Sequence, residues 1–373
     1  MQRNWLKQRR MGALLVVATV VAVGLNSIHV NTYRILPGDA SPLAPIIKVT
    51  GVSTAPHPHA TREGFMMVDV TLSQMTALGR IIADFRGATD TIDLAALVPK
   101  GSTFADFDRQ SYLDMEGSKT AAELNAFRTL GWPVPATPRG ALITDTVQGG
   151  PAKSAGIQVA DRIVSINGTA TPDRCTATTL LHSLRSGTVV HIGVEHARIS
   201  GSGVISYRPV SVATVKTVKL PKDVGISDCP GISTLAKSWI GVAMQDAVSY
   251  AFPATVTIDT NYIGGPSAGL AMTLALIDQL SSGSLSGHRK IAVTGEMSLG
   301  GLVGDIGGIT QKTQAAITAG ASVFIVPANQ VREAQQAAHG QLRVIGAYRL
   351  AQVLSRLRQL GGDRPIPYTK PNF

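Results

Sequence analysis

The sequence is short of residues and segments that several classes of protein need. Its 373 residues include two cysteines, Cys175 and Cys229, and only 5% of the residues are aromatic. Two isolated cysteines do not give the ligand spacing of a zinc site, so we expect no metal and no other cofactor. They do permit one disulfide, and the sequence leaves open whether it forms. The phosphate-binding segment Gly-x-x-x-x-Gly-Lys-Ser/Thr is also missing.

Positive charge is in excess, with a formal net charge of +10. Four basic residues stand in positions 1–10, ahead of a mainly apolar run over positions 11–30. About 20 helical residues span a bilayer core of ~30 Å, and basic flanks stay in the cytoplasm. The pattern predicts a cytoplasmic tail at 1–10 and a transmembrane anchor at 11–30, in a single-pass protein of the cell membrane. A cleaved signal peptide is the alternative.

Two glycine-rich motifs in the last third of the chain contain candidate catalytic side chains. Ser267 lies in Gly-Gly-Pro-Ser-Ala-Gly at positions 264–269, and Lys312 ends Gly-Gly-Ile-Thr-Gln-Lys at positions 307–312. A serine hydroxyl becomes a good nucleophile when a base removes its proton. A lysine can be that base where burial favours its neutral amine, and serine–lysine pairs are a known version of this design. The pair predicts an acyl-transfer enzyme, and a peptidase in particular.

Other interpretations of the serine motif fit less well. Gly-x-Ser-x-Gly is also the nucleophile elbow of α/β-hydrolases, and Asp305 and His339 follow in the order that such a triad needs. However, no run of βα units precedes the serine, and few residues follow it. The Ser-x-x-Lys pattern is excluded because position 270 is leucine. The structural alternative is a tight turn in which Ser267 only caps a helix.

The surroundings of both motifs have a recognisable order. A glycine-rich loop and a helix over 262–280 precede a strand at 290–296, a glycine-rich turn, a helix with Lys312 and a strand at 322–327. This order resembles the proteolytic domain of the Lon proteases, over residues 237–355.

The resemblance to Lon proteases implies roles for three residues. Ser267 would be the nucleophile and Lys312 the base, and Thr294, from a Thr-Gly-Glu segment, would lie near the lysine amine and help to hold it. The sequence departs from the Lon pattern at Gly264, where many Lon proteases have an acid, and at Thr310, where they have a lysine. Neither departure removes the serine or the base.

The middle of the chain shows a second pattern. Strands at 140–147 and 161–168, the latter reading Asp-Arg-Ile-Val-Ser-Ile-Asn-Gly, precede a helix at 178–185 and a strand at 188–195. This order resembles a bacterial PDZ domain, over residues 126–220. PDZ domains bind a peptide as an added strand, with one apolar pocket for a side chain.

Further predictions concern the PDZ-like pattern and the segment that precedes it. The segment 130–134 is the candidate loop for a peptide end, and Leu181 and Leu184 either line the pocket or belong to the core. Residues 31–125 are expected to form an extracytoplasmic, membrane-proximal segment. Its helix, at 106–130, has four candidate buried positions: Tyr112, Met115, Ala122 and Phe127.

Nearly the whole chain resembles the membrane-anchored, Lon-like PDZ proteases often called the YlbL type. We therefore predict an α+β multidomain fold with an N-terminal transmembrane helix, a PDZ-like domain and a C-terminal Lon-type α/β proteolytic domain. The expected function is an ATP-independent, membrane-anchored serine endopeptidase. It would cleave extended extracytoplasmic peptides or small membrane-surface proteins that the PDZ domain selects. The alternative is a non-catalytic PDZ scaffold with an inactive Lon-like domain.

The expected partners follow from these predictions. They are a peptide or protein substrate and, through residues 11–30, the lipid bilayer, while a homo-oligomer is left open. Beyond the first ten residues the positive charge is diffuse, and aromatic side chains for base stacking are few. We therefore expect no nucleic-acid partner.

Overall fold

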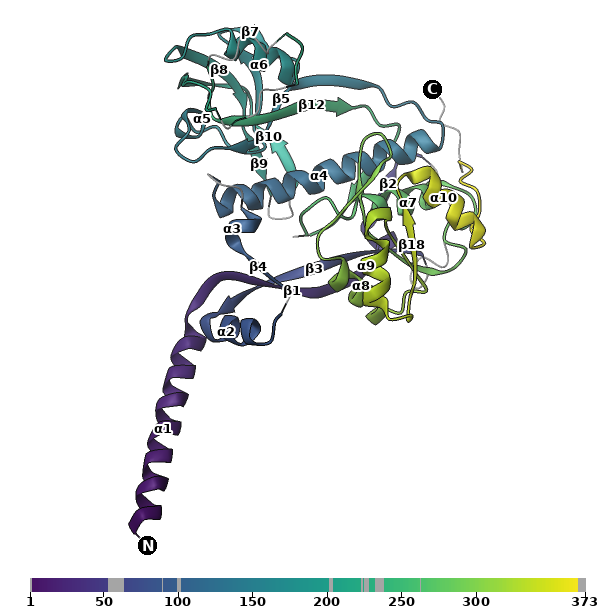
Figure 1. Cartoon of the computed structure of the whole chain (residues 1–373). Helices are drawn as coiled ribbons and strands as arrows, with labels where there is room; N and C mark the ends of the chain where they lie inside the picture. Colours follow the sequence, from purple (N-terminus) through teal and green to yellow (C-terminus); the bar gives the residue numbers. More distant parts are fainter. Residues whose placement is uncertain are drawn as a thin grey trace. The chain divides into compact units, whose positions relative to one another are not determined.

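The computed structural model describes residues 2–52, 64–88, 90–98, 102–200, 204–222, 224, 228–231, 238–261 and 263–367, apart from the side chains of residues 2–11. The chain divides into two compact units (Figure 1). The first comprises Met1–Gly38 and Val70–Lys100, and the second Asp39–Asp69 and Gly101–Phe373. Tyr262, the first residue of the predicted catalytic loop, lies outside the described residues.

The first unit contains a long helix and an antiparallel pair of strands. Helix α1 (Gln2–Ser27) leads into strand β1 (His29–Pro42), which pairs with strand β4 (Thr91–Asp93). The hydroxyl of Thr32 on β1 donates a hydrogen bond to the Asp93 carboxylate, at 2.6 Å. The unit also holds two shorter helices, α2 (Ala77–Phe85) and α3 (Leu94–Leu97).

The prediction of a transmembrane anchor at residues 11–30 is wrong. In the part of the chain that the structure describes, no helix combines the length and the apolar character needed to cross a bilayer. Helix α1 ends at Ser27, and strand β1 begins at His29, inside the predicted span. The predicted span is therefore not one continuous apolar helix, because its last residues belong to a strand. The same finding contradicts the predicted single-pass location in the cell membrane.

Four strands form the parallel part of a six-stranded sheet in the order β18-β17-β14-β3-β1-β4. Strand β14 pairs in parallel with β3 and with β17, and β17 pairs in parallel with β18. Parallel neighbours need crossover connections, and helices supply them here. The strands of this part are β3 (Gly64–Thr76), β14 (Lys290–Val293), β17 (Val323–Pro327) and β18 (Arg343–Ala347).

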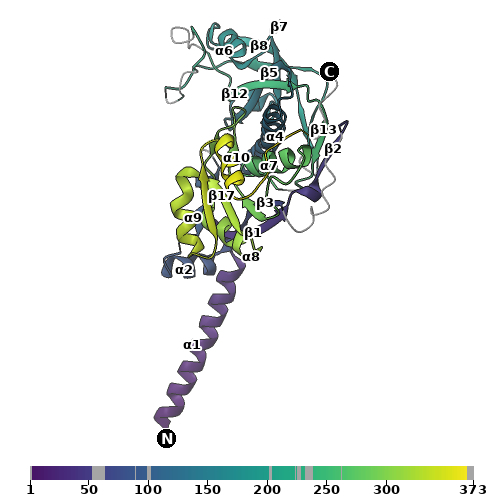
Figure 2. The same ribbon diagram turned by 90° about the vertical axis from the view of Figure 1, so that its right-hand side faces the viewer.

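Helices cover both faces of the parallel strands, as Figures 1 and 2 show. Because successive strand residues point to opposite faces, Phe65 and Met67 of β3 enter one core and Met66 and Val68 enter another. Helices α4 (Phe104–Thr129), α7 (Gly269–Leu280) and α10 (Leu350–Gln359) contribute to the first core. Helices α8 (Ile309–Thr318) and α9 (Val331–Ala338) contribute to the second. This part of the chain is thus a layered α/β domain.

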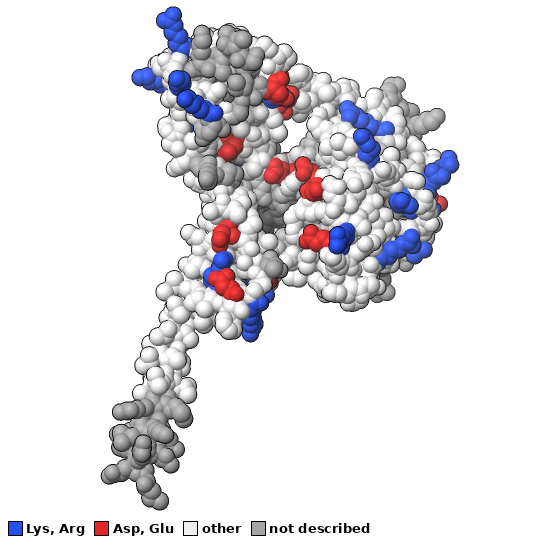
Figure 3. Space-filling view, in the orientation of Figure 1, with Lys and Arg blue, Asp and Glu red and all other residues white. Residues whose placement is uncertain are grey.

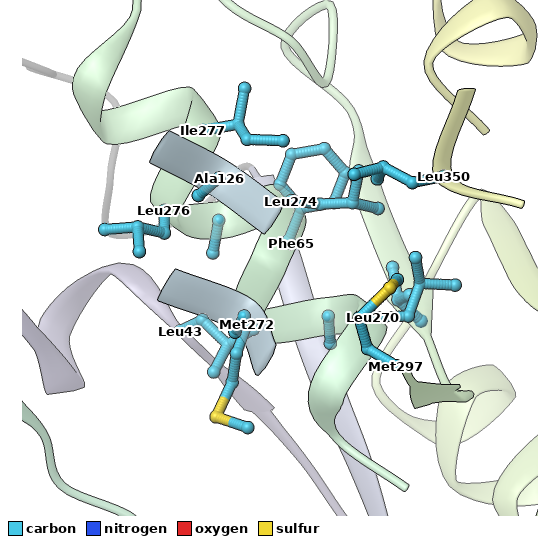
Figure 4. Close-up of a cluster of buried hydrophobic side chains, with 14 of the residues drawn as sticks. Leu43, Phe65, Ala126, Leu270, Met272, Leu274, Leu276, Ile277, Met297 and Leu350 are labelled. Atoms are coloured by element: carbon cyan, nitrogen blue, oxygen red, sulfur yellow. The ribbon is translucent and has the colours of Figure 1, made fainter. Parts of the chain in front are cut away.

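Helix α7 lies in the middle of the larger core. Figure 4 shows its side chains Leu270 and Leu274 among residues from distant segments, such as Phe65, Ala126 and Leu350. A helix that is apolar on all sides is stable only when it is buried on all sides. The core therefore needs α4 and β3, which precede the PDZ-like segment, as well as elements that follow it.

Helix α4 confirms part of the predicted burial. It begins with a capping box between Thr103 and Asp106. Of the predicted positions, Met115, Ala122 and Phe127 are buried, whereas Tyr112 is half-buried. Strand β2 (Ile47–Thr50) also joins this domain, because it pairs with β13 (Thr255–Ile258).

The PDZ-like part is built on a second sheet, with the strand order β11-β8-β6-β5-β12. Its core is formed by buried aliphatic residues between 141 and 240, and Cys175 forms a disulfide with Cys229. The strands of this sheet are β5 (Ala136–Thr146), β6 (Arg162–Ile166), β8 (Val189–Glu195), β11 (Ser211–Lys216) and β12 (Val242–Tyr250). Smaller elements are α5 (Pro151–Ser154), α6 (Arg174–His182), β7 (Thr169–Ala170), β9 (Ala197–Ile199) and β10 (Ile205–Tyr207).

The chain enters and leaves the PDZ-like part side by side. Ala136 at the start of β5 pairs with Tyr250 at the end of β12. Next to them, the Ala251 backbone N–H donates to the Pro135 carbonyl, at 2.9 Å. The PDZ-like part is therefore inserted into the α/β domain through one pair of adjacent strands.

Candidate active site

The nucleophile loop, residues 263–268, is fixed to helix α4. The Gly265 backbone N–H donates to the Ser111 carbonyl, and the Ser118 hydroxyl donates to the Pro266 carbonyl, both at 2.8 Å. Gly265 has a φ of +87°, in the left-handed region that glycine adopts without strain. These contacts present Ser267 just before the N-terminus of α7.

Two glycines allow neighbouring elements to approach this loop closely. A Cβ on Gly264 would lie 2.2 Å from the Oγ of Ser111. A Cβ on Gly269 would lie 2.6 Å from the Oγ of Ser118 and 2.9 Å from the Cβ of Met297. A side chain at position 264 would therefore require the Ser111 side chain to move.

Helix α8 brings Lys312 to the serine. The helix follows Gly308, which has a left-handed φ of +70°, and carries Lys312 in its first turn. The lysine is buried, with 3% of its surface exposed, and its Nζ lies 2.6 Å from the Oγ of Ser267. Its distance to the Oγ1 of Thr294 is 3.5 Å. The Thr294 hydroxyl donates to the Ser267 carbonyl, at 3.2 Å. All three predicted site residues are thus neighbours.

Burial changes the acidity of the lysine. It lowers the pKa of Lys312 to about 8, against an opposing attraction from the Asp69 carboxylate. The cause is the loss of water around the ammonium group, which favours the neutral amine. A pKa near the working pH suits a general base.

Asp69 is a neighbour that the sequence did not reveal. It lies on β3, burial raises its pKa, and its carboxylate accepts a hydrogen bond from the Asp39 backbone N–H at 2.8 Å. It stands about 200 residues before Ser267 and belongs to none of the motifs. Only the pairing of β3 with β14 brings it near Lys312, so no sequence signal pointed to it.

Backbone donors lie next to the nucleophile. The described residues form many backbone hydrogen bonds in turns and loops. None of these bonds is donated by the N–H group of Ser267 or Ala268. Both precede α7, whose N-terminus carries a partial positive charge. Such groups can stabilise an oxyanion.

The residues of the rejected hydrolase triad lie elsewhere. Asp305 is exposed and accepts hydrogen bonds from the Asn329 side chain, at 3.1 and 3.3 Å. His339 is exposed at the end of α9. Neither is hydrogen-bonded to Ser267. Over the described ranges, no group of three potential metal ligands is found either.

The candidate peptide-binding residues of the PDZ-like part are core residues. Leu181 is buried in the PDZ core, with 3% of its surface exposed, and Leu184 packs against that core. In the predicted end-binding loop, Leu130 and Trp132 are buried in the core of the α/β domain. The Trp132 ring stacks on Phe127, with the ring centroids 5.4 Å apart. Of the two alternatives for the leucines, the structure supports the core.

The comparisons with known proteins agree with this arrangement. Residues 260–359 match the family described as the Lon protease (S16) C-terminal proteolytic domain, and residues 128–195 match the PDZ domain family. The chain therefore carries a Lon-type proteolytic domain, which is a serine peptidase module, together with a PDZ domain. The predicted resemblance to Lon-like, PDZ-containing proteases is confirmed.

Individual relatives show how far the similarity extends. A Lon protease of Phenylobacterium zucineum is 50% identical over 64 residues, which are 17% of this chain and 8% of the relative. A Lon protease of Chloroflexus aggregans is 38% identical over 92 residues, which are 24% of this chain and 11% of the relative. The chain thus matches about a tenth of the length of these relatives.

Among solved structures, the PDZ domain of the SdrC-like protein from Listeria monocytogenes is similar to part of this chain. It is 18% identical, and the match covers 28% of this chain and 86% of that domain with a TM-score of 0.21.

Proposed function

We propose that this protein is a serine endopeptidase in which Ser267 is the nucleophile and Lys312 the general base. The observation that carries the proposal is the 2.6 Å distance between the lysine Nζ and the serine Oγ, with the lysine buried. A serine and a lysine in contact at a surface would both be hydrated, and the lysine would be charged. Here burial lowers the pKa of Lys312 to about 8, so a fraction of the amine, roughly a tenth at pH 7, is neutral and can accept a proton.

The proposed reaction proceeds through an acyl-enzyme. The Ser267 Oγ attacks the carbonyl carbon of the substrate while the Lys312 amine takes its proton. The backbone N–H groups of Ser267 and Ala268 stabilise the oxyanion. The lysine then gives the proton to the leaving amine as the peptide bond breaks. Water, activated by the same lysine, releases the acyl group. Thr294 positions the lysine through the 3.5 Å contact between its Oγ1 and Nζ.

The proposal also covers how substrates are selected and whether cleavage needs ATP. Strand β12 is the last strand of the PDZ sheet, and an edge strand offers backbone groups to which an extended peptide can add. We propose that the domain selects substrates in this way. The sequence has no phosphate-binding loop, which supports cleavage without ATP and hence of chains that are already extended.

An unstructured, quenched-fluorescence peptide library tests the proposal. The purified full chain should cleave it without ATP, and Ser267→Ala should reduce cleavage at least about 10³-fold while leaving the circular dichroism spectrum unchanged. Ser355→Ala is the matched control, because Ser355 is exposed on α10. If the wild-type chain cleaves no peptide, the alternative of a non-catalytic PDZ scaffold stands. Cleavage that survives in Ser267→Ala would reject the nucleophile.

A further inference from the structure

A cavity of about 460 Å³ adjoins the nucleophile loop. Pro266, Ser118 and Glu296 line it. Pro266 immediately precedes Ser267, and the Ser118 hydroxyl donates to the Pro266 carbonyl. Glu296 begins strand β15 (Glu296–Met297), directly after Gly295, whose backbone N–H donates to the Ser267 carbonyl at 2.9 Å. The volume is in the usual range for ligand pockets. The cavity therefore begins at the residue next to Ser267, although Ser267 and Lys312 do not line it themselves.

The charge of the cavity is opposite to that of the whole chain. Four carboxylates line it, although Lys and Arg outnumber Asp and Glu by 34 to 24 in the sequence. Figure 3 shows acidic side chains on both sides of a hollow in the second unit, whereas most basic side chains lie on its outer surfaces. The four are Asp114 and Glu116 on α4, Asp246 on β12 and Glu296 on β15.

Protein groups already neutralise some of the charges in the cavity. Glu116 forms an ion pair with Lys119 at 2.8 Å. The single cation in the lining, Arg162, forms an ion pair with Glu195 at 2.6 Å and lies 3.4 Å from the centre of the Tyr207 ring. These contacts leave Arg162 little capacity to balance further acids.

Asp246 accepts a hydrogen bond from the Arg174 backbone N–H at 2.9 Å and is attracted by the Arg174 charge. Asp114 and Glu296 are the two remaining acids of the cavity. Within the described ranges, neither forms an ion pair with a lysine, an arginine or a histidine. Asp114 accepts one hydrogen bond, from the Gln110 side chain at 2.6 Å. Burial, together with the nearby charge of Glu296, raises the pKa of Asp114. Asp114 is partly buried and Glu296 is exposed, so a cation that enters the cavity would relieve the repulsion that the Glu296 charge exerts on Asp114.

The rest of the lining suits a long aliphatic side chain. Leu113, Met297 and Tyr250 contribute apolar surface to the same cavity. Lysine and arginine bury their methylene stems against such surface while the charged end reaches a polar group. The cavity thus combines an apolar wall with unpaired carboxylates.

We infer that this cavity binds a lysine or arginine side chain of the substrate, through Asp114 and Glu296. The protein would therefore cleave peptides that carry a basic residue close to the scissile bond. The inference rests on the proposed peptidase function and deepens it, because it names a class of substrate.

Paired peptides test the inference. Each pair carries either lysine or norleucine, which keeps the aliphatic stem without the charge, at one position near the cleaved bond. The wild-type chain should show a kcat/KM for the lysine peptide roughly tenfold higher at one such position. The ratio should fall towards one in the double variant Asp114→Asn/Glu296→Gln and at high salt. Asp108→Asn is the matched control, because Asp108 is exposed on the same helix and does not line the cavity.

The outcomes separate the inference from the function on which it rests. If the wild-type chain cleaves neither peptide, the proposed function fails. Equal cleavage of both peptides at every position overturns the inference alone. So does a lysine preference that survives in the double variant. Binding of Ca²⁺ or Mg²⁺ that is lost in the double variant would make the cavity a metal site and would also overturn it.

Discussion

The two domains of the second unit are assembled from the sequence in different ways. The PDZ domain is one continuous stretch, whose core residues all lie between 141 and 240. The proteolytic domain draws its main core from residues 43 to 357 and surrounds the PDZ stretch on both sides. A disulfide closes the PDZ domain, whereas the proteolytic domain contains a buried ionisable lysine, Lys312. The continuous domain is specified locally, and the other depends on contacts between distant segments.

The largest expected effect is confined to the proteolytic domain. Lys312→Met should reduce peptide cleavage about 10³-fold or more, because no base remains, and Lys312→Arg should be equally inactive because guanidinium stays protonated. At pH 7 the same Met variant should unfold at a higher denaturant concentration, since it removes a buried charge. Peptidase assays and urea unfolding give the two readouts. Lys216→Met, at an exposed site on β11, is the control. Normal turnover in Lys312→Met would contradict the mechanism.

The next effect is confined to the PDZ domain. Replacing Cys175 and Cys229 by serine removes a crosslink between residues 54 positions apart. In the loop-entropy description, such a crosslink contributes about 4 kcal/mol at most. Hydrogen exchange should show the loss of protection in residues 136–250, while cleavage of a short peptide changes less than about twofold. Equal loss of protection in both domains would show that they unfold together.

Measurements of activity and stability against pH should distinguish the two domains. With a Lys312 pKa of about 8, the neutral base and hence kcat/KM should rise about tenfold between pH 7 and 9. The unfolded lysine keeps its proton up to a pKa of 10.5, so the stability of the proteolytic domain should also rise with pH between about 8 and 10.5. In the PDZ domain, burial lowers the pKa of His182, so that domain should lose stability as the pH falls below 6.5. A flat activity profile, with chemistry rate-limiting, would exclude Lys312 as the base.

The smallest expected effect concerns the link between α4 and the nucleophile loop. Ser118→Ala removes the 2.8 Å hydrogen bond to the Pro266 carbonyl. A bond of this kind contributes about 1 kcal/mol, so kcat should fall roughly fivefold. The pH profile should keep its midpoint, because the lysine is untouched. A shifted midpoint would show that Ser118 acts on the base itself and not on the position of the loop.

The sequence was most informative where structure and function are local. Ser267, Thr294 and Lys312 lie within one match to the Lon family, so their neighbourhood could be predicted from motifs. The position of Asp69 near Lys312 could not be predicted, because strand pairing alone brings it near the lysine. Burial on α4 was predicted from apolar residues in a helical segment, but such residues do not identify the element against which the helix packs. The partner proved to be α7, more than 100 residues away.

The errors also have physical causes. The apolar run at 11–30 has the composition of a membrane helix, yet its helix stops at Ser27 and the chain continues as a strand. Composition does not show where a helix ends. Leu181 has the helical spacing of a pocket residue, but that spacing equally places a side chain in the core, where it is found.

The insertion of the PDZ domain also determines the order in which the protein can fold during synthesis. Ser118 and its partner Pro266 are 148 residues apart. A ribosome adds about 5–20 residues per second, so α4 would wait roughly 7–30 s for the loop that it supports. During that interval the complete PDZ domain can already fold, while β3 and α4 expose apolar surface without their partners. The contact between Ser267 and Lys312 likewise cannot form before the last third of the chain has emerged.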